Sequence, residues 1–255
     1  MGRKGWITRI LSPFTYAPLR EEDKTAPGQL LWKQLDLIYR YRSINPQTRL
    51  YGLIGSPIDH SIGHLYHNDQ FRKYHQDAVY LKLEVAAEEL PLFWQEVQTL
   101  PFFGFSITAP LKERLVPSET INTLYRTEKE WHYCSTDGVA ALEVLGEVLG
   151  KRVVILGTGG VAKAIAFVLK KEGADLKLLQ RNETIPYYDI LINATSSPKP
   201  DFVYRWIPHS IVMDVATYCT PFLKQAQMGK ARTVNGLSLY FHQALLQSVL
   251  WRHLT

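Results

Sequence analysis

Apolar and polar residues follow one another along this chain in blocks that predict strands and helices in turn. The clearest block runs from Val153 to Ala166: four apolar residues lead into Gly157-Thr158-Gly159-Gly160-Val161-Ala162, and a helical repeat follows. A short apolar run that ends in glycine is typical of a buried strand, and apolar residues spaced three to four apart are typical of a helix. The block therefore predicts a strand, a tight turn and a helix.

Similar blocks stand on both sides of it. Before it, the pattern predicts strands at 50–55, 79–85 and 102–108, and helices at 62–74 and 87–100. After it, the pattern predicts buried parallel strands at 175–180, 189–194 and 210–216, and a final amphipathic helix at 237–251. An amphipathic helix is also predicted at 29–41. This alternation favours an α/β fold with two domains.

The glycine-rich turn has the spacing of a dinucleotide-binding motif. Gly157 permits the tight turn, Gly159 lets the backbone approach a pyrophosphate, and the small Ala162 lets the helix pack on the strand. Backbone N–H groups and the helix dipole would then face the phosphates. The alternative is a glycine turn in an α/β domain that binds no nucleotide.

Composition narrows the class of protein. The 255 residues are 46% hydrophobic and 21% charged, as in ordinary globular domains. No apolar run approaches the ~18 residues that span a bilayer, so we expect no membrane partner. The N-terminus is a poor signal peptide. Cys134 and Cys219 lack metal-ligand spacing, so we expect no metal site and two small buried side chains. Because there are only two cysteines, we expect a cytoplasmic protein.

The net charge of +5 is spread along the chain rather than gathered in a run. We therefore expect no nucleic-acid partner, because such proteins carry a basic patch or stripe. A ligand with phosphate or carboxylate groups would account for the basic balance.

Four polar segments follow predicted strands or open predicted helices, at 55–64, 105–112, 120–123 and 135–138. Each has an ordinary structural interpretation: Ser61 as a helix N-cap, Lys112 as a surface lysine, and the Asn and Asp residues as turn formers. For Ser61 the residues alone leave a ligand-binding role equally open, whereas for Lys112 and for the Asn and Asp residues they favour the structural interpretation.

Taken in order, these segments resemble the shikimate dehydrogenase family from about residue 50 to the end. The matches lie in the family's G-x-P-x-x-H-S, N-V-T-x-P-x-K, N-T, N-T-D-G, glycine, I-N-A-T-S and C-terminal G-x(6)-Q motifs. They include Gly55, Pro57, His60, Ser61, His67, Asn68, Thr108, Pro110, Lys112, Asn122, Asp137, Ile192 to Ser196, Gly236 and Gln243.

Four positions depart from the pattern. Gly63 replaces a second serine, His64 a proline and Ser106 an asparagine, while Tyr218 lies one residue later than the family pattern asks. We expect an active enzyme with altered substrate contacts, because Lys112 and Asp137 are both present.

The resemblance implies a two-domain α/β fold with a Rossmann-type domain, and the NADP-dependent, reversible reduction of 3-dehydroshikimate to shikimate. It implies that Lys112 and Asp137 flank the reacting oxygen, where an ammonium stabilises a developing alkoxide. It implies that Ser61 binds the substrate carboxylate. Substrate contacts are further implied for Thr108, Asn122, Tyr218 and Gln243, and cofactor contacts for Gly157, Gly159, Gly160, Val161, Ala162, Arg181, Thr195 and Gly236.

The choice of cofactor depends on the end of the strand predicted at 175–180. NAD sites usually place an acidic residue there, but this chain has Gln180-Arg181-Asn182. Because a guanidinium binds a phosphate well, Arg181 favours NADP. A quinate/shikimate dehydrogenase that uses NAD, and a non-catalytic sensor that binds NADP or shikimate, remain alternatives.

The first 46 residues resemble the C-terminal end of type I 3-dehydroquinate dehydratase. Gly5 to Arg9, Thr15-Tyr16-Ala17 and Ala26-Pro27-Gly28-Gln29 match that family's final motifs in order. This resemblance implies that the chain is part of a bifunctional dehydratase–dehydrogenase, without dehydratase activity of its own. We expect this remnant to be loosely held unless a partner domain is present. The predicted domains are the remnant at 1–46, a substrate-binding catalytic domain at 47–136 plus 237–255, and a Rossmann NADP-binding domain at 137–236.

Overall fold

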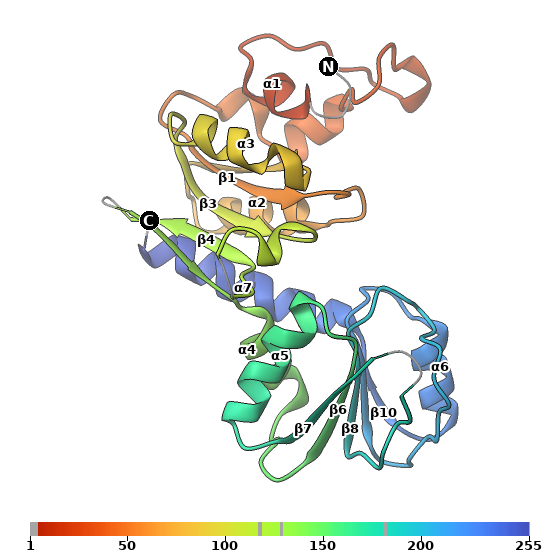
Figure 1. Ribbon diagram of the computed structural model, residues 1–255. Coiled ribbons are helices and arrows are strands. Elements are labelled where there is room, and N and C mark those ends of the chain that lie inside the picture. The colour runs from red at the N-terminus through yellow and green to blue at the C-terminus, as the bar shows by residue number, and fades with distance from the viewer. Residues whose placement is uncertain (1–4, 117–118, 128–129, 181–182, 255) are drawn as a thin grey trace. The chain divides into compact units, whose positions relative to one another are not determined.

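A computed structural model describes residues 5–116, 119–127, 130–180 and 183–254 (Figure 1). Backbone contacts divide the chain into two compact units. The first comprises Met1–Pro117, Asn122–Cys134 and Gln247–Thr255, and the second comprises Ser118–Ile121 and Ser135–Leu246. Which ligand each unit binds stays a prediction.

The first unit is built on a mixed five-stranded sheet in the order β2-β1-β3-β4-β5. Strand β1 pairs in parallel with both β2 and β3, while β4 and β5 add an antiparallel hairpin. The strands are β1 (Arg49–Gly55), β2 (Ala78–Glu84), β3 (Phe102–Ile107), β4 (Thr123–Arg126) and β5 (Trp131–Cys134). The three predicted strands are confirmed, whereas the hairpin was not predicted.

Helices cover both faces of this sheet. Helix α2 (Gly63–Lys73) and the end of α7 (Gly236–Leu254) pack on one face, and α3 (Leu90–Val97) packs on the other. The helix predicted at 87–100 is shorter than expected: a 3-10 turn, η5 (Ala87–Glu89), precedes α3. Pro91, in the first turn of α3, has no N–H to lose there and helps to set the helix start.

The C-terminal residues complete the core of the first unit. Trp251 has no exposed surface, and its indole donates to the Leu124 carbonyl oxygen at 3.0 Å. A Cβ on Gly104 would overlap the indole ring, so glycine is needed where α7 crosses β3. Tyr51, Phe71 and Tyr80 surround the same tryptophan.

The N-terminal segment folds differently from its prediction. The helix predicted at 29–41 is wrong: only 32–38 is helical, and most of it is the π-helical η3 (Gln34–Ile38). The Gln34 side chain accepts a hydrogen bond from Leu31 N at 2.9 Å and so begins this helix late. The segment's other short helices are α1 (Trp6–Leu11), η2 (Glu21–Asp23) and η4 (Tyr41–Ser43).

The same segment is not loosely held. Arg40 donates to the carbonyl oxygens of Gln76 and Ala78 at 3.2 and 3.0 Å, which ties it to the start of β2. Four of its side chains are at most 4% exposed: Ile10, Leu30, Leu35 and Tyr39. Apolar burial of this extent is the main favourable term in folding, so the segment belongs to the first unit's core.

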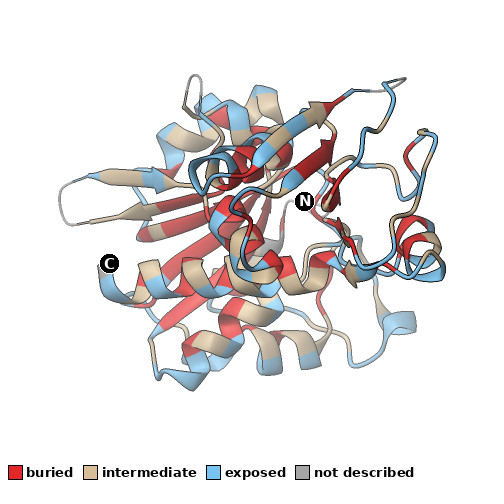
Figure 2. Cartoon of the chain, turned by 90° about the horizontal axis from the view of Figure 1, so that it is seen from below, coloured by how far each residue is buried: buried red, intermediate tan, exposed pale blue. Residues whose placement is uncertain are grey.

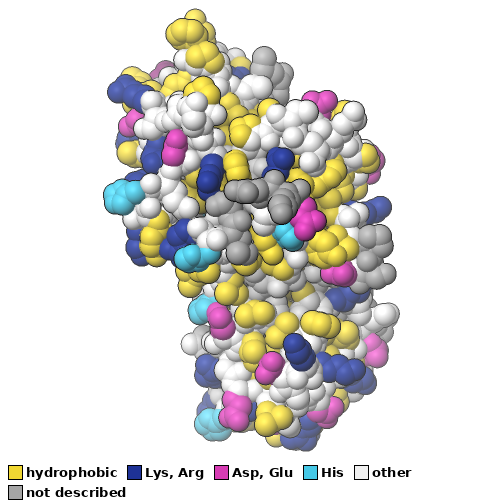
Figure 3. All heavy atoms as spheres, turned by 90° about the vertical axis from the view of Figure 1, so that its left-hand side faces the viewer, with side chains coloured by type: hydrophobic (Ala, Val, Ile, Leu, Met, Phe, Trp, Pro, Cys, Tyr) yellow, Lys and Arg dark blue, Asp and Glu magenta, His cyan; other side chains and the backbone are white. Residues whose placement is uncertain are grey.

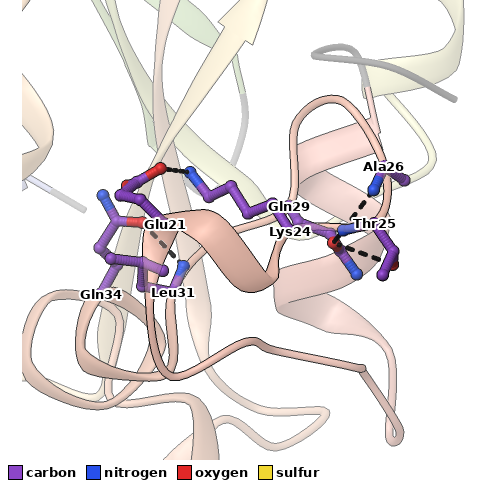
Figure 4. Close-up of polar contacts among 7 residues, drawn as sticks. All are labelled: Glu21, Lys24, Thr25, Ala26, Gln29, Leu31 and Gln34. Carbon is purple, nitrogen blue, oxygen red and sulfur yellow. Dashed lines mark hydrogen bonds and ion pairs between the residues drawn. The ribbon is translucent and has the colours of Figure 1, made fainter.

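Gln29, the last residue of the dehydratase-like motif at 26–29, turns back onto its own loop. Its side-chain oxygen accepts from Thr25 N at 2.8 Å and Ala26 N at 3.2 Å (Figure 4). Lys24 pairs with Glu21 at 2.7 Å nearby. These contacts give Gln29 a structural role in this chain.

The second unit is a doubly wound parallel sheet in the order β10-β9-β8-β6-β7. Its strands are β6 (Arg152–Leu156), β7 (Asp175–Leu179), β8 (Ile190–Asn193), β9 (Ile211–Asp214) and β10 (Arg232–Val234). Alternate residues of β6 enter two cores: Val153 packs with α4 (Asp137–Leu145) and α5 (Gly160–Lys171), and Val154 packs with α6 (Pro221–Met228). Figure 2 shows buried residues along the strands and on the inner sides of the helices.

Strand order places the ligand edge of the second unit. The chain passes from β6 to β7 on one side and then to β8 on the other, so the direction of winding reverses between β6 and β8. In open α/β sheets, ligands bind at the carboxyl ends of the strands at such a switch point. The predicted glycine turn follows β6 and therefore lies at this point.

Candidate active site

The carboxyl edge of the first sheet gathers three of the predicted segments. Thr108 N donates to the Ile54 carbonyl oxygen at 3.0 Å, and Ile107 N donates to the Asn122 carbonyl oxygen at 2.8 Å. Gly55 has φ +149°, and a Cβ there would overlap the Thr108 side chain. The glycine therefore lets the loops after β1 and β3 meet, which brings Thr108 and Asn122 to the same edge.

Lys112 lies on the 3-10 turn η6 (Leu111–Glu113) just after β3. Leu111 has no exposed surface and anchors this turn, and its N–H donates to the Thr108 carbonyl oxygen at 2.9 Å. Lys112 itself is half-buried. The hydrogen bond between Leu111 and Thr108 thus fixes the turn that carries the lysine.

Gln247, which the motifs did not single out, connects the C-terminal helix to this edge. Its side-chain oxygen accepts from Ser106 Oγ at 2.8 Å, and its Nε2 donates to the Asn122 carbonyl oxygen at 3.0 Å and to Thr123 Oγ1 at 2.9 Å. The side chain is 1% exposed. Gln247 therefore fixes both Asn122 and Ser106.

Ser61 lies just before α2 and is held from two sides. Its Oγ accepts from Gly63 N at 3.3 Å, and its carbonyl oxygen accepts from the Lys82 ammonium at 3.3 Å. Lys82 also donates to the Asp59 carbonyl oxygen at 2.9 Å. Sequence reasoning missed Lys82, although a lysine inside the apolar run of β2 was a signal: it ties the Ser61 loop to the sheet.

Burial shifts the titration of the groups under this loop. It lowers the pKa of Lys82, while the carboxylates of Asp59 and Glu84 oppose the shift. Burial lowers the pKa of His64 to about 4, and the Lys82 charge adds to the effect. Burial also lowers the pKa of His67 to about 3. Both imidazoles are therefore neutral at neutral pH.

In the second unit, Asp137 begins α4 and is 6% exposed. A Cβ on the next residue, Gly138, would overlap the Ala164 carbonyl oxygen of α5, so glycine lets the two helices pack closely. The positive end of the helix dipole stabilises a carboxylate in this first turn. Thr136 Oγ1 donates to the carbonyl oxygen of Gln243 at 3.3 Å, which brings predicted Gln243 beside the start of α4.

The glycine turn has the form that the sequence predicts. Gly157 has φ +106°, a conformation that favours glycine, and Gly159 is the N-cap of α5. Apart from its chain neighbours, no atom of the residues that the structure describes would lie within 4 Å of a Cβ on Gly159. Gly160 and Val161 open α5, and the buried Ala162 packs into the core. The open space beside Gly159, facing a helix N-terminus, fits a phosphate group.

Thr195 lies next to this turn, after β8. A Cβ on Gly157 would lie 3.1 Å from Thr195 Cγ2. Thr195 Oγ1 donates to Asn193 Oδ1 at 2.7 Å, and Asn193 donates to Asp214 Oδ2 at 3.1 Å. Thr220 Oγ1 donates to the same carboxylate oxygen at 2.7 Å. This buried network fixes the loops that follow β8 and β9.

Three further predicted residues have different outcomes. Tyr218 is 59% exposed on the loop after β9. Gly236 is buried, and a Cβ there would overlap the backbone of Val215, so close packing alone requires glycine at this position. Arg181 lies outside the described residues, so its predicted phosphate contact stays a prediction.

Surface and composition add little to this picture. In the described residues no helix is long and apolar enough to cross a membrane, and no group of three His, Cys, Asp or Glu could hold a metal ion. Basic and acidic side chains are interspersed on the face in Figure 3. Cys134 is half-buried and Cys219 exposed, so the expectation of two buried cysteines is wrong for Cys219.

Comparison with known proteins identifies the family. The family model of the shikimate dehydrogenase substrate binding domain matches residues 53–124. Shikimate dehydrogenase (NADP(+)) from Pyrococcus abyssi is 34% identical over 80% of this chain and 92% of its own length. The chain belongs to the shikimate dehydrogenase family. The crystal structure of shikimate dehydrogenase from Aquifex aeolicus agrees, with a TM-score of 0.75 at 26% identity over 82% of this chain and 94% of that one.

A longer relative covers almost the whole chain. Shikimate biosynthesis protein AroDE from Chlamydia pneumoniae is 34% identical over 98% of this chain, which corresponds to 61% of that protein. In two further Chlamydia relatives, the matched region corresponds to 60% of the relative's length. The chain thus spans about three fifths of the length of these curated relatives.

Proposed function

We propose that this chain catalyses the reversible, NADP-dependent reduction of 3-dehydroshikimate to shikimate. The observation that carries the proposal is the edge of the first sheet in a member of this family, where the turn η6, which carries Lys112, is hydrogen-bonded through Leu111 to Thr108. Asn122 is held at the same edge, and Ser61 stands before α2. These residue types suit an acid with several hydroxyl groups: the hydroxyls and the amide bind polar groups, and the ammonium faces a carbonyl oxygen.

Lys112 and Asp137 carry the proposed reaction. The Lys112 ammonium stabilises the alkoxide that develops on the substrate oxygen and can donate a proton to it. The Asp137 carboxylate, held in the first turn of α4, would orient the lysine or the substrate hydroxyl. Thr108, Asn122, Tyr218 and Gln243 are proposed to bind the ring hydroxyls, and Ser61 the carboxylate.

The nicotinamide cofactor supplies and accepts the hydride. Gly157, Gly159 and the N–H groups that open α5 would hold its pyrophosphate, because the space beside Gly159 is open. Thr195 and Gly236 are proposed neighbours of the cofactor. The relatives named as NADP(+) enzymes support NADP, and Arg181 is the proposed partner of its 2′-phosphate.

One assay tests this proposal: initial rates with shikimate and with quinate, each with NADP and with NAD. We expect the highest kcat/KM for shikimate with NADP. Preference for NAD would contradict the role of Arg181, and preference for quinate would favour the quinate/shikimate alternative. A folded protein that binds both ligands without turnover would instead be a sensor.

We further propose that the chain is the dehydrogenase part of a bifunctional dehydratase–dehydrogenase. Its partial coverage of the Chlamydia relatives supports this, as does a bifunctional 3-dehydroquinate dehydratase/shikimate dehydrogenase from Arabidopsis thaliana that is 30% identical over 71% of the chain. Sequencing the transcript upstream of the Met1 codon is the test. An open frame that encodes a dehydratase supports the fusion, and an in-frame stop codon directly before Met1 contradicts it.

We also propose a cytoplasmic location, which the two free thiols of Cys134 and Cys219 support. Cell fractionation with an antibody against the chain tests it, and recovery with an extracellular or periplasmic fraction would contradict it.

A further inference from the structure

The N-terminal segment lies along helix α2, the helix that Ser61 precedes. Helix η3 packs against α2, and Arg72, near the end of α2, donates to the Leu37 carbonyl oxygen at 2.6 Å. At the start of α2, the Tyr39 ring stacks on the His64 ring, with centroids 6.1 Å apart and 21° between the ring planes. The segment therefore contacts both ends of this helix.

The Tyr39 side chain contributes a ring rather than a hydrogen bond. It is 2% exposed, and among the described residues its hydroxyl has no hydrogen-bond partner. Removing a buried hydroxyl that makes no hydrogen bond costs little, whereas removing a buried ring leaves a cavity. Any effect of Tyr39 on its neighbours is therefore carried by the ring.

His64 connects this ring to the loop that carries Ser61. It lies in the first turn of α2, three residues after Ser61, and its imidazole interacts with the Ser61 backbone, which opposes the effect of burial on the pKa of His64. The His64 carbonyl oxygen accepts from Asn68 Nδ2 at 2.8 Å, and the same nitrogen donates to the Tyr80 carbonyl oxygen at 2.9 Å. The backbone of His64 is thus tied to β2, while its ring interacts with both Tyr39 and the Ser61 loop.

Neither residue of this pair is part of the family's motifs. Tyr39 lies outside residues 53–124, which the family model matches. His64 stands where the family pattern has a proline. A proline in the first turn of a helix has a fixed φ and needs no partner for an N–H, so it presets the start of the helix. Histidine does not, so this turn depends on contacts from outside the helix.

We propose that Tyr39 and His64 are positioning residues: their contact holds the first turn of α2, and with it the Ser61 hydroxyl, in the place that binds the substrate carboxylate. This inference rests on the proposed function, which assigns the carboxylate to Ser61. It gives the N-terminal segment a part in the affinity for shikimate, in addition to its part in stability.

The first test is Tyr39→Leu, which keeps an apolar side chain and removes the aromatic ring. We expect the KM and Kd for shikimate to rise about 2- to 10-fold, as for the loss of one aromatic pair. The kcat and the KM for NADP should stay the same, because the change reaches the Ser61 loop alone. Tyr39→Phe keeps the ring and should equal the wild type. Steady-state kinetics and calorimetry measure these constants; an unchanged Kd for shikimate in Tyr39→Leu overturns the inference.

Ile10→Ala is the matched control for stability. Ile10 lies on α1, in another part of the N-terminal segment, and is 1% exposed, so this variant also removes buried apolar surface. It should lower the Tm and leave the KM for shikimate unchanged. An equal rise in that KM in Ile10→Ala and Tyr39→Leu would be an effect of general destabilisation and overturns the inference.

A double-mutant cycle tests whether Tyr39 acts through His64. His64→Ala should also raise the KM for shikimate, and adding Tyr39→Leu to it should raise the KM no further, because the pair is already broken. His64→Pro in the Tyr39→Leu background should recover part of the affinity, because proline presets the start of the helix by itself. Two fold-changes that multiply in the double variant, or no recovery with proline, overturn the inference.

Hydrogen exchange separates failure of this inference from failure of the proposed function. In Tyr39→Leu, the amides of residues 58–66 should exchange faster than in the wild type, and those of β6, in the second unit, should not change. Unchanged exchange at 58–66 overturns the inference, whether or not the protein turns over shikimate. Faster exchange there, in a protein whose wild type neither binds nor turns over shikimate, supports the positioning of this turn and contradicts the proposed function.

Discussion

Lys112 gives the sharpest test at the scale of a single residue. Lys112→Ala removes the ammonium and leaves Leu111, the buried anchor of the turn, in place. We expect kcat for shikimate oxidation to fall at least about 100-fold, with the affinity for NADP nearly unchanged, because the lost interaction strengthens in the transition state. Steady-state kinetics with NADP titrations measure both. Arg114→Ala, an exposed cation just after the same turn, is the control; equal kcat in Lys112→Ala and wild type would remove the lysine from the mechanism.

His64 and His67 predict how stability depends on pH. Both pKa values are lowered in the folded chain, to about 4 and about 3, from an ordinary value of 6.5. Between pH 6.5 and 4 the unfolded chain therefore binds more protons than the folded one, so the free energy of unfolding falls as the pH falls. Each histidine contributes at most about 1.4 kcal/mol per pH unit in this window.

Urea denaturation at pH 7 and pH 5 measures this dependence. His64→Gln should reduce the difference in the free energy of unfolding between the two pH values, because it removes a group whose pKa folding lowers. The same difference in wild type and His64→Gln would mean that His64 titrates alike in the folded and unfolded chain.

Single residues also show where sequence reasoning stops. The motifs found Ser61, Thr108, Lys112 and Asn122, which do lie along one sheet edge or at the adjoining helix. They did not find Gln247, because a glutamine one helical turn after Gln243 carries no sign that three hydrogen bonds bury it. Such partners come from strands more than a hundred residues away, and neither periodicity nor local spacing reports them.

At the scale of elements, two variants of the glycine turn distinguish an effect on stability from an effect on cofactor binding. Gly159→Ala adds a methyl group that, apart from its chain neighbours, has no atom of the described residues within 4 Å, so Tm should change little. The methyl group would occupy the space proposed for the pyrophosphate, so we expect the KM for NADP to rise about tenfold or more. Thermal unfolding and kinetics of the same preparation test both parts.

Gly157→Ala is the contrasting variant. Its φ of +106° is strained for any side chain, and the new Cβ would lie 3.1 Å from Thr195. We expect a loss of about 1–3 kcal/mol in stability. If Gly159→Ala lowers Tm as much as Gly157→Ala does, or leaves the KM for NADP unchanged, the open space has no part in binding.

Elements with strong apolar runs were predictable, and elements set by distant contacts were not. The parallel strands β6, β8 and β9 consist almost entirely of apolar residues, so their sequences mark them as buried. The short strand β4 is only half buried and exists because it pairs with β3. The helix predicted at 29–41 does not form over its full length for two reasons. The Gln34 side chain accepts a hydrogen bond from Leu31 N before the helix begins, and Arg40 adopts a left-handed conformation after it ends, with φ +51°.

At the scale of the whole chain, the N-terminal segment should contribute to stability. Deleting residues 1–46 removes Ile10, Leu35 and Tyr39 from the core of the first unit. Each buried side chain of this size contributes about 1.5–3 kcal/mol, so we expect Tm to fall by at least about 5 °C. Differential scanning calorimetry measures it, with Phe14→Ala as the control because Phe14 is 87% exposed. An unchanged Tm in the deletion variant would show that the first unit is stable without this segment.

Trp251 has a consequence for a chain that is shortened at its C-terminal side. Residues 135–246 contain nearly all of the second unit, so a variant that stops after residue 246 keeps that unit. The first unit loses Trp251 from its aromatic cluster and the hydrogen bond between Gln247 and Ser106. In such a variant, limited proteolysis should cut the first unit readily while residues 135–246 still resist it.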